Sequence, residues 1–260
     1  MALPPPSARY PSLQDRAVLI TGGATGIGAT LVEAFARQGA RVGFLDLAAE
    51  AGQALAAHLA GTAGVRHTPA FVAADLTDIA ALRAAIATLR GACGPFGCLV
   101  NNAANDTRHT LEATTPESFD AGIAVNLKHQ FFAAQAVAPD MRAAGGGSIV
   151  NLGSISWMLT QDDLPVYTTA KSAVQGLTRS LARELGRQRI RVNTVVPGWV
   201  MTERQLRLWV KPESKAIIAK GQCIDEPLMP EHIASMVLFL AADDSAMCTA
   251  QDFIVDGGWV

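Results

Sequence analysis

The amino-acid sequence predicts a single α/β domain in which a seven-stranded parallel sheet is covered by helices on both faces. Short apolar segments alternate with longer segments in which apolar residues recur at helical spacing. Parallel strands need crossover connections of this kind, and strands covered on both faces are apolar throughout. No internal repeat, linker or break in composition divides the chain. We therefore expect one doubly wound domain over residues 15–260, preceded by a flexible proline-rich tail over residues 1–14.

The expected elements follow one another in a regular order. The helical pattern of Ile27–Gln38 ends at Gly39, a residue that commonly terminates helices. Two later helices are expected to begin at Pro116, after Thr115, and at Pro230, because proline is tolerated at the first helical position. The seven expected strands are Ala17–Thr21, Arg41–Asp46, Pro69–Asp75, Cys98–Ala103, Ser148–Ser154, Ile190–Pro197 and Asp252–Gly258.

Composition excludes several classes of function. Half of the 260 residues are hydrophobic, and 21 basic against 23 acidic residues give a net charge of −2 without any run of Lys or Arg. The sequence therefore gives no sign of a basic surface that would bind nucleic acid or an anionic membrane. Its longest apolar stretches are too short to span a bilayer, and its first residues lack the apolar core of a signal peptide.

The four cysteines show no pattern of a metal site. Cys93, Cys98, Cys223 and Cys248 form no C-x-x-C pair and have no histidine at ligand spacing. We expect isolated thiols, no metal and, with no signal peptide expected, a cytoplasmic location.

A glycine-rich turn follows the first expected strand. Gly22, Gly26 and Gly28, with Thr25 and Ile27 between them, give a G-x-x-x-G-x-G spacing before a helix. Glycines at such a turn let the backbone approach a pyrophosphate, whose charge meets the helix N-terminus. A plain turn that needs glycine only for its backbone angles is the alternative.

An acidic residue ends the second expected strand. Asp46 could accept hydrogen bonds from both adenosine ribose hydroxyls and would repel a 2′-phosphate. The cation that a 2′-phosphate needs is missing, since Leu47 follows the aspartate and Thr25 occupies the glycine turn. We therefore predict NAD rather than NADP. As an alternative, Asp46 only begins the next helix.

Polar residues also end the third and fourth expected strands. Asp75, followed by Leu76, could meet the adenine amino group, or it could simply cap the following helix. Asn102 and Ala103 lie where the amide can bind neighbouring backbone and the small side chain leaves room for a cofactor. A purely structural role for these amides is an equal alternative.

Taken in order, these motifs resemble those of the short-chain dehydrogenase/reductase family. The likeness runs from about Arg16 to Val260, and Ala104 departs from it because the family more often has glycine there. It implies a Rossmann-type fold and a nicotinamide cofactor. The motifs that carry it are "TGGATGIG" from Thr21, Asp46, "DL" at Asp75, "NNAA" at Asn101, Asn126, Ser154, "YTTAK" at Tyr167 and "PGWVMT" at Pro197.

The resemblance implies a catalytic role for four residues. Tyr167 and Lys171 are four residues apart and share one helix face, so that Lys171 and the oxidised nicotinamide would lower the pKa of the phenol. Tyr167 would then take the proton of the substrate hydroxyl, while Ser154 binds the reacting oxygen. Lys171 would also bind the nicotinamide ribose, and Asn126 would hold a water that links it to solvent.

Three further residues are expected to complete the cofactor site. After the sixth strand ends at Pro197, the backbone of Val200 and the side chain of Thr202 can reach the carboxamide of the nicotinamide. The segment that follows lies where the family carries a mobile lid over its substrate, although a surface helix would fit the same sequence.

Residues expected near the substrate are polar or aromatic. We predict Asn105, Gln161 and Trp199 as sugar contacts, with Arg108 and His109 as weaker candidates that could instead anchor a loop or contact a neighbouring subunit. Around these residues the sequence is similar to that of the family's aldose 1-dehydrogenases. This similarity implies oxidation of an anomeric hydroxyl to a lactone.

Two alternatives remain open. One is an oxidoreductase for another secondary alcohol or ketone, such as a ketoacyl substrate or a polyol. The other is a non-catalytic regulator that binds NAD, which the intact set of Ser154, Tyr167, Lys171 and Asn126 argues against. By resemblance we also expect a homotetramer, with residues 174–185 and the last strand at its interfaces.

Overall fold

The computed structural model describes residues 7–260, apart from the side chain of Lys215, and confirms the predicted fold class. Its seven parallel strands pair in the order β3-β2-β1-β4-β5-β6-β7. The strands are β1 Ala17–Thr21, β2 Arg41–Asp46, β3 Ala70–Ala73, β4 Cys98–Asn101, β5 Gly147–Leu152, β6 Ile190–Pro197 and β7 Asp252–Val255.

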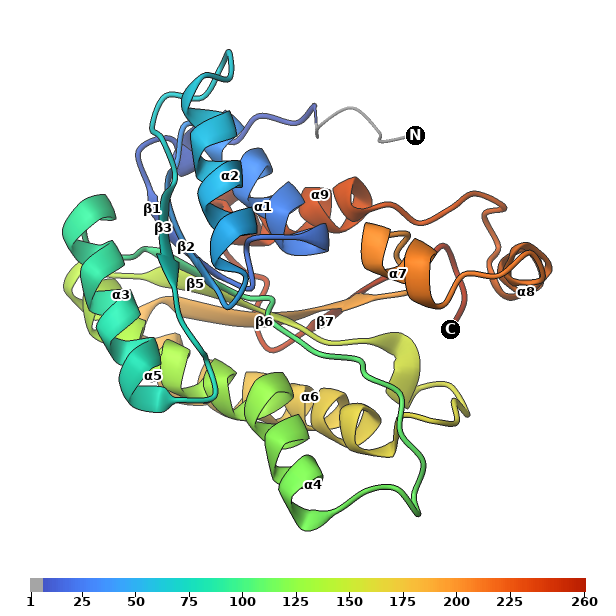
Figure 1. Ribbon diagram of the computed structural model, residues 1–260. Helices are drawn as coiled ribbons and strands as arrows, with labels where there is room; N and C mark the ends of the chain where they lie inside the picture. The colour runs from blue at the N-terminus through green and yellow to red at the C-terminus, as the bar shows by residue number, and fades with distance from the viewer. Residues whose placement is uncertain (1–6) are drawn as a thin grey trace.

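Helices cover both faces of this sheet (Figure 1). Helices α1, α2 and α9 lie on one face, and α3, α4, α5 and α6 lie on the other. None of the helices within the described range is long and apolar enough to cross a membrane. The helices are α1 Gly26–Arg37, α2 Ala49–Ala60, α3 Ile79–Cys93, α4 Pro116–Ile123, α5 His129–Ala143, α6 Pro165–Leu185, α7 Glu203–Leu208, α8 Ser214–Gly221 and α9 Pro230–Ala241.

Shorter helical turns connect several of these elements. A π-helical turn over Ala124–Lys128 joins α4 to α5. The 3₁₀ turns are Pro11–Leu13, Ile155–Trp157, Gly186–Gln188 and Asp243–Ser245.

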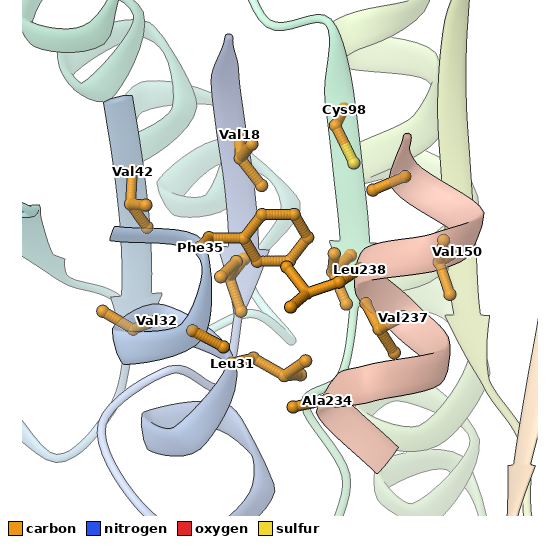
Figure 2. Packing of buried hydrophobic residues seen from close by; sticks show 14 of the residues in the cluster. Val18, Leu31, Val32, Phe35, Val42, Cys98, Val150, Ala234, Val237 and Leu238 are labelled. Carbon is orange, nitrogen blue, oxygen red and sulfur yellow. The ribbon is translucent and has the colours of Figure 1, made fainter. Parts of the chain in front are cut away.

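Two apolar cores hold the layers together, one on each face of the sheet. On the first face, Leu31 and Phe35 of α1 are one helical turn apart and point to the sheet. Figure 2 shows them packed against Val237 and Leu238 of α9 and against Val18 of β1. This packing fixes the start of α1, and therefore the glycine turn, at the carboxyl edge of β1.

The prediction of a flexible tail over residues 1–14 is wrong for residues 7–14. Pro11 begins a 3₁₀ turn that buries Leu13 completely in the core between α1 and α9. The Tyr10 N–H donates to Gln38 Oε1 at 3.0 Å, and Gln38 Nε2 donates to the Ala8 carbonyl at 2.7 Å. Because one apolar side chain and these bonds tie the segment down, it belongs to the domain. Residues 1–6 lie outside the described residues.

Candidate active site

The glycine turn between β1 and α1 forms a cradle at the carboxyl edge of the sheet. Gly22 has φ +66°, and a Cβ on it would lie 2.6 Å from the Cα of Ala103. A Cβ on Gly28 would collide with the Gly22 carbonyl oxygen. The Thr25 side chain makes no capping hydrogen bond, so the first N–H groups of α1 are left for an anion.

Asp46 and Thr202 border this cradle. The Asp46 carboxylate accepts the Ala24 N–H at 2.9 Å and the Ala48 N–H at 3.0 Å, which leaves each oxygen a second lone pair for a ribose hydroxyl. The Thr202 methyl would lie 3.3 Å from a Cβ on Gly26. These features fit the pyrophosphate and ribose of a dinucleotide.

The other predicted cofactor residues lie along the same edge of the sheet. Pro197 ends β6, and the nearly buried Val200 pairs with Leu228 in an isolated bridge. Leu76 is nearly buried in the core beneath α3 and α5. Asp75 accepts the backbone N–H and the hydroxyl of Thr77, bonds that lower its pKa, so that in the structure its partners are local.

The end of β4 ties the sheet to the glycine turn. Asn102 Nδ2 donates to the carbonyls of Thr21 and Gly22 at 3.1 and 2.8 Å. The Thr21 hydroxyl in turn accepts the N–H groups of Asn102 and Ala103. Through these bonds the Asn102 amide has the structural role that was the alternative to cofactor binding. The small side chain of Ala103 packs against Gly22. Ala104, the departure from the family pattern, is exposed.

Ser154, Tyr167 and Lys171 come together beside this edge. Ser154 follows β5 and caps the turn Ile155–Trp157 by accepting the Ser156 N–H at 3.2 Å. Tyr167 and Lys171 lie on α6, as their spacing predicts, with Lys171 Nζ 5.7 Å from the centre of the tyrosine ring. Lys171 is 1% exposed, and its Nζ donates to the Leu152 carbonyl at 2.9 Å.

Asn126 lies in the π-helical turn and clamps the loop after β4. Its Oδ1 accepts the Asn105 N–H at 2.9 Å, and its Nδ2 donates to the carbonyls of Asn105 and Gly122 at 3.1 and 3.0 Å. Both amide hydrogens therefore donate to protein carbonyls, and a bound water would need a hydrogen-bond donor other than this amide. The role of Asn126 in holding water stays a prediction.

The predicted substrate contacts have different surroundings. Trp199 Nε1 donates to Gln205 Oε1 at 3.0 Å, and Arg108 lies over the ring of Trp209 at 4.9 Å. His109 binds the Thr107 carbonyl through Nδ1 and accepts the Val166 N–H at Nε2, as the loop-anchoring alternative expects.

Asn105 and Gln161 complete this set of contacts. Asn105 Oδ1 accepts the N–H and hydroxyl of Thr107, within its own loop. Gln161 is exposed in the loop between β5 and α6.

Three residues in this region escaped the sequence analysis. The Asp106 carboxylate accepts Arg204 Nε at 3.2 Å and Gln205 Nε2 at 2.6 Å. These residues belong to two stretches that the sequence predicts near the substrate, but partners 98 and 99 positions apart leave no local signal. No cluster of three or more side chains suited to a metal occurs in the described part of the chain.

Comparisons with known proteins identify the family. A family model described as enoyl-(acyl carrier protein) reductase matches residues 22–260. A probable galactose dehydrogenase, GalD, from Rhizobium meliloti (strain 1021) is 51% identical over 97% of this chain and 98% of the relative. The chain belongs to the short-chain dehydrogenase/reductase family. The predicted family and the predicted class of dehydrogenase are thereby confirmed.

Two further matches extend this result. A D-xylose 1-dehydrogenase from Caulobacter vibrioides (strain NA1000 / CB15N) is 49% identical to this short-chain dehydrogenase over 97% of the chain and 99% of the relative. The solved structure of a short-chain type dehydrogenase/reductase from Mycobacterium ulcerans has a TM-score of 0.90 and covers 97% of this chain and 91% of that one. At 24% identity, that structure supports the fold alone. Dehydrogenases of this family use NAD or NADP.

The expected lowering of the pKa of Tyr167 does not come from the protein's own groups. Burial raises the pKa of Tyr167 to about 12, against an opposing effect of Ser154, while Asp106 raises it and Arg108 lowers it. Burial also lowers the pKa of Lys171 to about 8. Burial therefore dominates the pKa of the phenol in the protein without dinucleotide, and the lowering expected from Lys171 and the oxidised nicotinamide together stays a prediction.

Proposed function

We propose that the protein oxidises the C1 hydroxyl of an aldose to the lactone, with NAD as the hydride acceptor. The observation that carries this proposal is the identity of 51% and 49% to two proteins named as sugar dehydrogenases, which extends over nearly the whole chain. The polar and aromatic side chains of Asn105, Asp106 and Trp199, which hydrogen bonds through Arg204 and Gln205 join into one cluster, suit a substrate rich in hydroxyl groups.

In this proposal Tyr167 accepts the proton of the C1 hydroxyl, and Ser154 donates a hydrogen bond to the reacting oxygen. When bound, the oxidised nicotinamide supplies the hydride acceptor and a positive charge that favours the phenolate. Lys171 binds the nicotinamide ribose, and its amine passes the proton toward solvent near Asn126.

We propose NAD rather than NADP because the Asp46 carboxylate borders the cradle and forms no ion pair with a cationic side chain among the described residues. A 2′-phosphate would approach an acceptor that already holds two backbone N–H groups and has no hydrogen to donate. Titration of the purified protein with NAD and NADP, followed by tryptophan fluorescence, tests this assignment. Tighter binding of NADP would overturn it.

The proposed reaction is tested with a panel of aldoses and NAD, scored by NADH absorbance and by lactone formation. Tyr167→Phe should reduce turnover by at least about a thousandfold, because general-base catalysis and the lost alignment act together, and should leave NAD binding unchanged. Activity toward a ketoacyl thioester or a simple secondary alcohol, but no aldose, would favour the first alternative. Binding of NAD with no turnover of any of these would favour a regulator.

We also propose a homotetramer, as the family resemblance implies. The edge strand β7 supports it, because the exposed side chain of Ile254 and the half-buried Phe253 and Val255 are open to a partner. The cytoplasmic location expected from the cysteine pattern stays a prediction, which cell fractionation would test.

A further inference from the structure

A polar bridge joins the loop after β4 to the segment after β6. We call Asp106, Arg204 and Gln205 the latch. Both carboxylate oxygens of Asp106 are used, one by Arg204 Nε at 3.2 Å and the other by Gln205 Nε2 at 2.6 Å. The Asp106 side chain is 19% exposed, and such partly enclosed, charge-assisted bonds are stronger than those between exposed groups.

The latch continues to Trp199, a predicted substrate contact. Since an ionised carboxylate only accepts hydrogen bonds, Asp106 fixes which end of the Gln205 amide faces it. The nitrogen of Gln205 points to Asp106, and its oxygen therefore accepts the Trp199 indole N–H at 3.0 Å. The orientation of the indole thus depends on the charge of Asp106, two hydrogen bonds away.

The β4 side of the latch is anchored on a buried residue. Asn126 is 1% exposed and binds both the N–H and the carbonyl of Asn105, the residue before Asp106. Arg204 also reaches Asn105 Oδ1 at 3.4 Å. Beside the latch, Arg108 stacks on Trp209 and adds a second contact between the same two segments. The loop after β4 is therefore held by a buried residue and can hold the segment after β6 in place.

We propose that Asp106 is a positioning residue, which latches the segment 199–209 over the cleft and orients Trp199 against the substrate. Burial is the main cause that raises the pKa of Tyr167, and the charge of Asp106 adds to it, so the latch lies within electrostatic range of the proposed base. This inference deepens the proposed function and rests on it for the identity of the substrate.

The test compares Asp106→Asn with Asp120→Asn, a matched control on the exposed face of α4. The asparagine at position 106 keeps the shape but can present an N–H₂ group to Gln205. We expect the KM for the aldose to rise about tenfold, as for a lost charge-assisted hydrogen bond, with kcat changed less than about threefold. Binding of NAD and the melting temperature should stay close to those of the control.

A double-mutant cycle with Gln205→Leu tests the coupling. If the two residues act through one latch, the double variant should have a KM close to that of Asp106→Asn alone. Independent, multiplied effects would overturn the latch, and so would a variant that behaves like Asp120→Asn.

Limited proteolysis measures, without any substrate, how firmly the latch holds the segment after β6. Trypsin should cleave Asp106→Asn after Arg207, which is exposed close to the latch in sequence, several times faster than the control. Equal cleavage rates together with an unchanged KM refute the latch and leave the proposed function standing. Faster cleavage in a protein that oxidises no aldose supports the latch and refutes the proposed function.

Discussion

Lys171 shows at the scale of one residue how a functional group opposes folding. Its amine is 1% exposed, it donates to the Leu152 carbonyl, and burial lowers its pKa from 10.5 to about 8. That shift corresponds to roughly 3 kcal/mol of unfavourable free energy for the charged form at neutral pH. Stability alone would favour an apolar side chain here.

We therefore predict that Lys171→Met abolishes turnover but stabilises the protein without dinucleotide. At pH 7 the free energy of unfolding should rise by about 2 kcal/mol, since the lost hydrogen bond to Leu152 offsets about 1 kcal/mol. Because the pKa of the folded amine is lowered, the wild-type protein loses stability as the pH falls from 10.5 to 8. The advantage of the variant should therefore shrink as the pH is raised toward 10.

Urea unfolding at several pH values measures this difference. Lys128→Met, on the exposed side of the π-helical turn, is the control and should show no comparable change. A variant at position 171 that is less stable than wild type at pH 7 would contradict the argument from burial.

For single residues, the sequence predicted correctly those features that depend only on neighbouring positions in the chain. Tyr167 and Lys171 share a face because helical geometry fixes positions four apart. It missed Asp106, whose partners come from another segment, and it did not foresee how far burial raises the pKa of Tyr167 in the protein without dinucleotide. The degree to which the folded chain removes a phenol from water is a tertiary property, which the spacing of charges along the chain does not contain.

At the scale of elements, the turn between β1 and α1 allows the sharpest prediction. Gly28→Ala places a Cβ against the Gly22 carbonyl and 2.8 Å from Asn102 Nδ2, so the turn must shift. We expect a loss of about 1–3 kcal/mol in the free energy of unfolding and a large loss of NAD affinity, because the N–H groups of α1 move with the turn.

Gly91→Ala in α3 is the matched control, since a Cβ there meets nothing within 4 Å. This change should leave NAD binding unaltered and stabilise the helix by up to about 1 kcal/mol. Thermal unfolding and calorimetric titration with NAD check both variants. Wild-type NAD affinity in Gly28→Ala would show that the cradle is not the cofactor site.

The positions of the strands were predictable because apolar runs mark them directly. The starts of β1, β2, β4, β6 and β7 agree with the expectation, whereas β3, β4, β5 and β7 end before the predicted limits. At these ends the chain leaves the sheet to form the site, as at Ala103 beneath Gly22. Small residues such as Ala103, Gly153 and Gly257 continue past these ends, so the sequence does not show where strand pairing stops.

At the scale of the whole molecule, the β7 edge of the sheet carries an exposed apolar side chain. Strand β7 is the last in the sheet, and Ile254 is 42% exposed on it, while Asp252, Phe253 and Val255 are only half-buried. An uncovered apolar edge favours pairing with another chain. The proposed homotetramer would cover it with a second copy of the protein.

We predict that Ile254→Lys breaks one of the interfaces of this assembly. The wild-type protein should scatter light with four times the mass of the 27.2 kDa chain, and the variant should give a smaller species, because a charged side chain is costly to bury without a partner. Leu111→Lys changes another exposed apolar residue, on the loop before α4, and should leave the mass unchanged. If Ile254→Lys keeps the wild-type mass, the edge of β7 is not an interface, and a wild-type protein with the mass of one chain would rule out the tetramer itself.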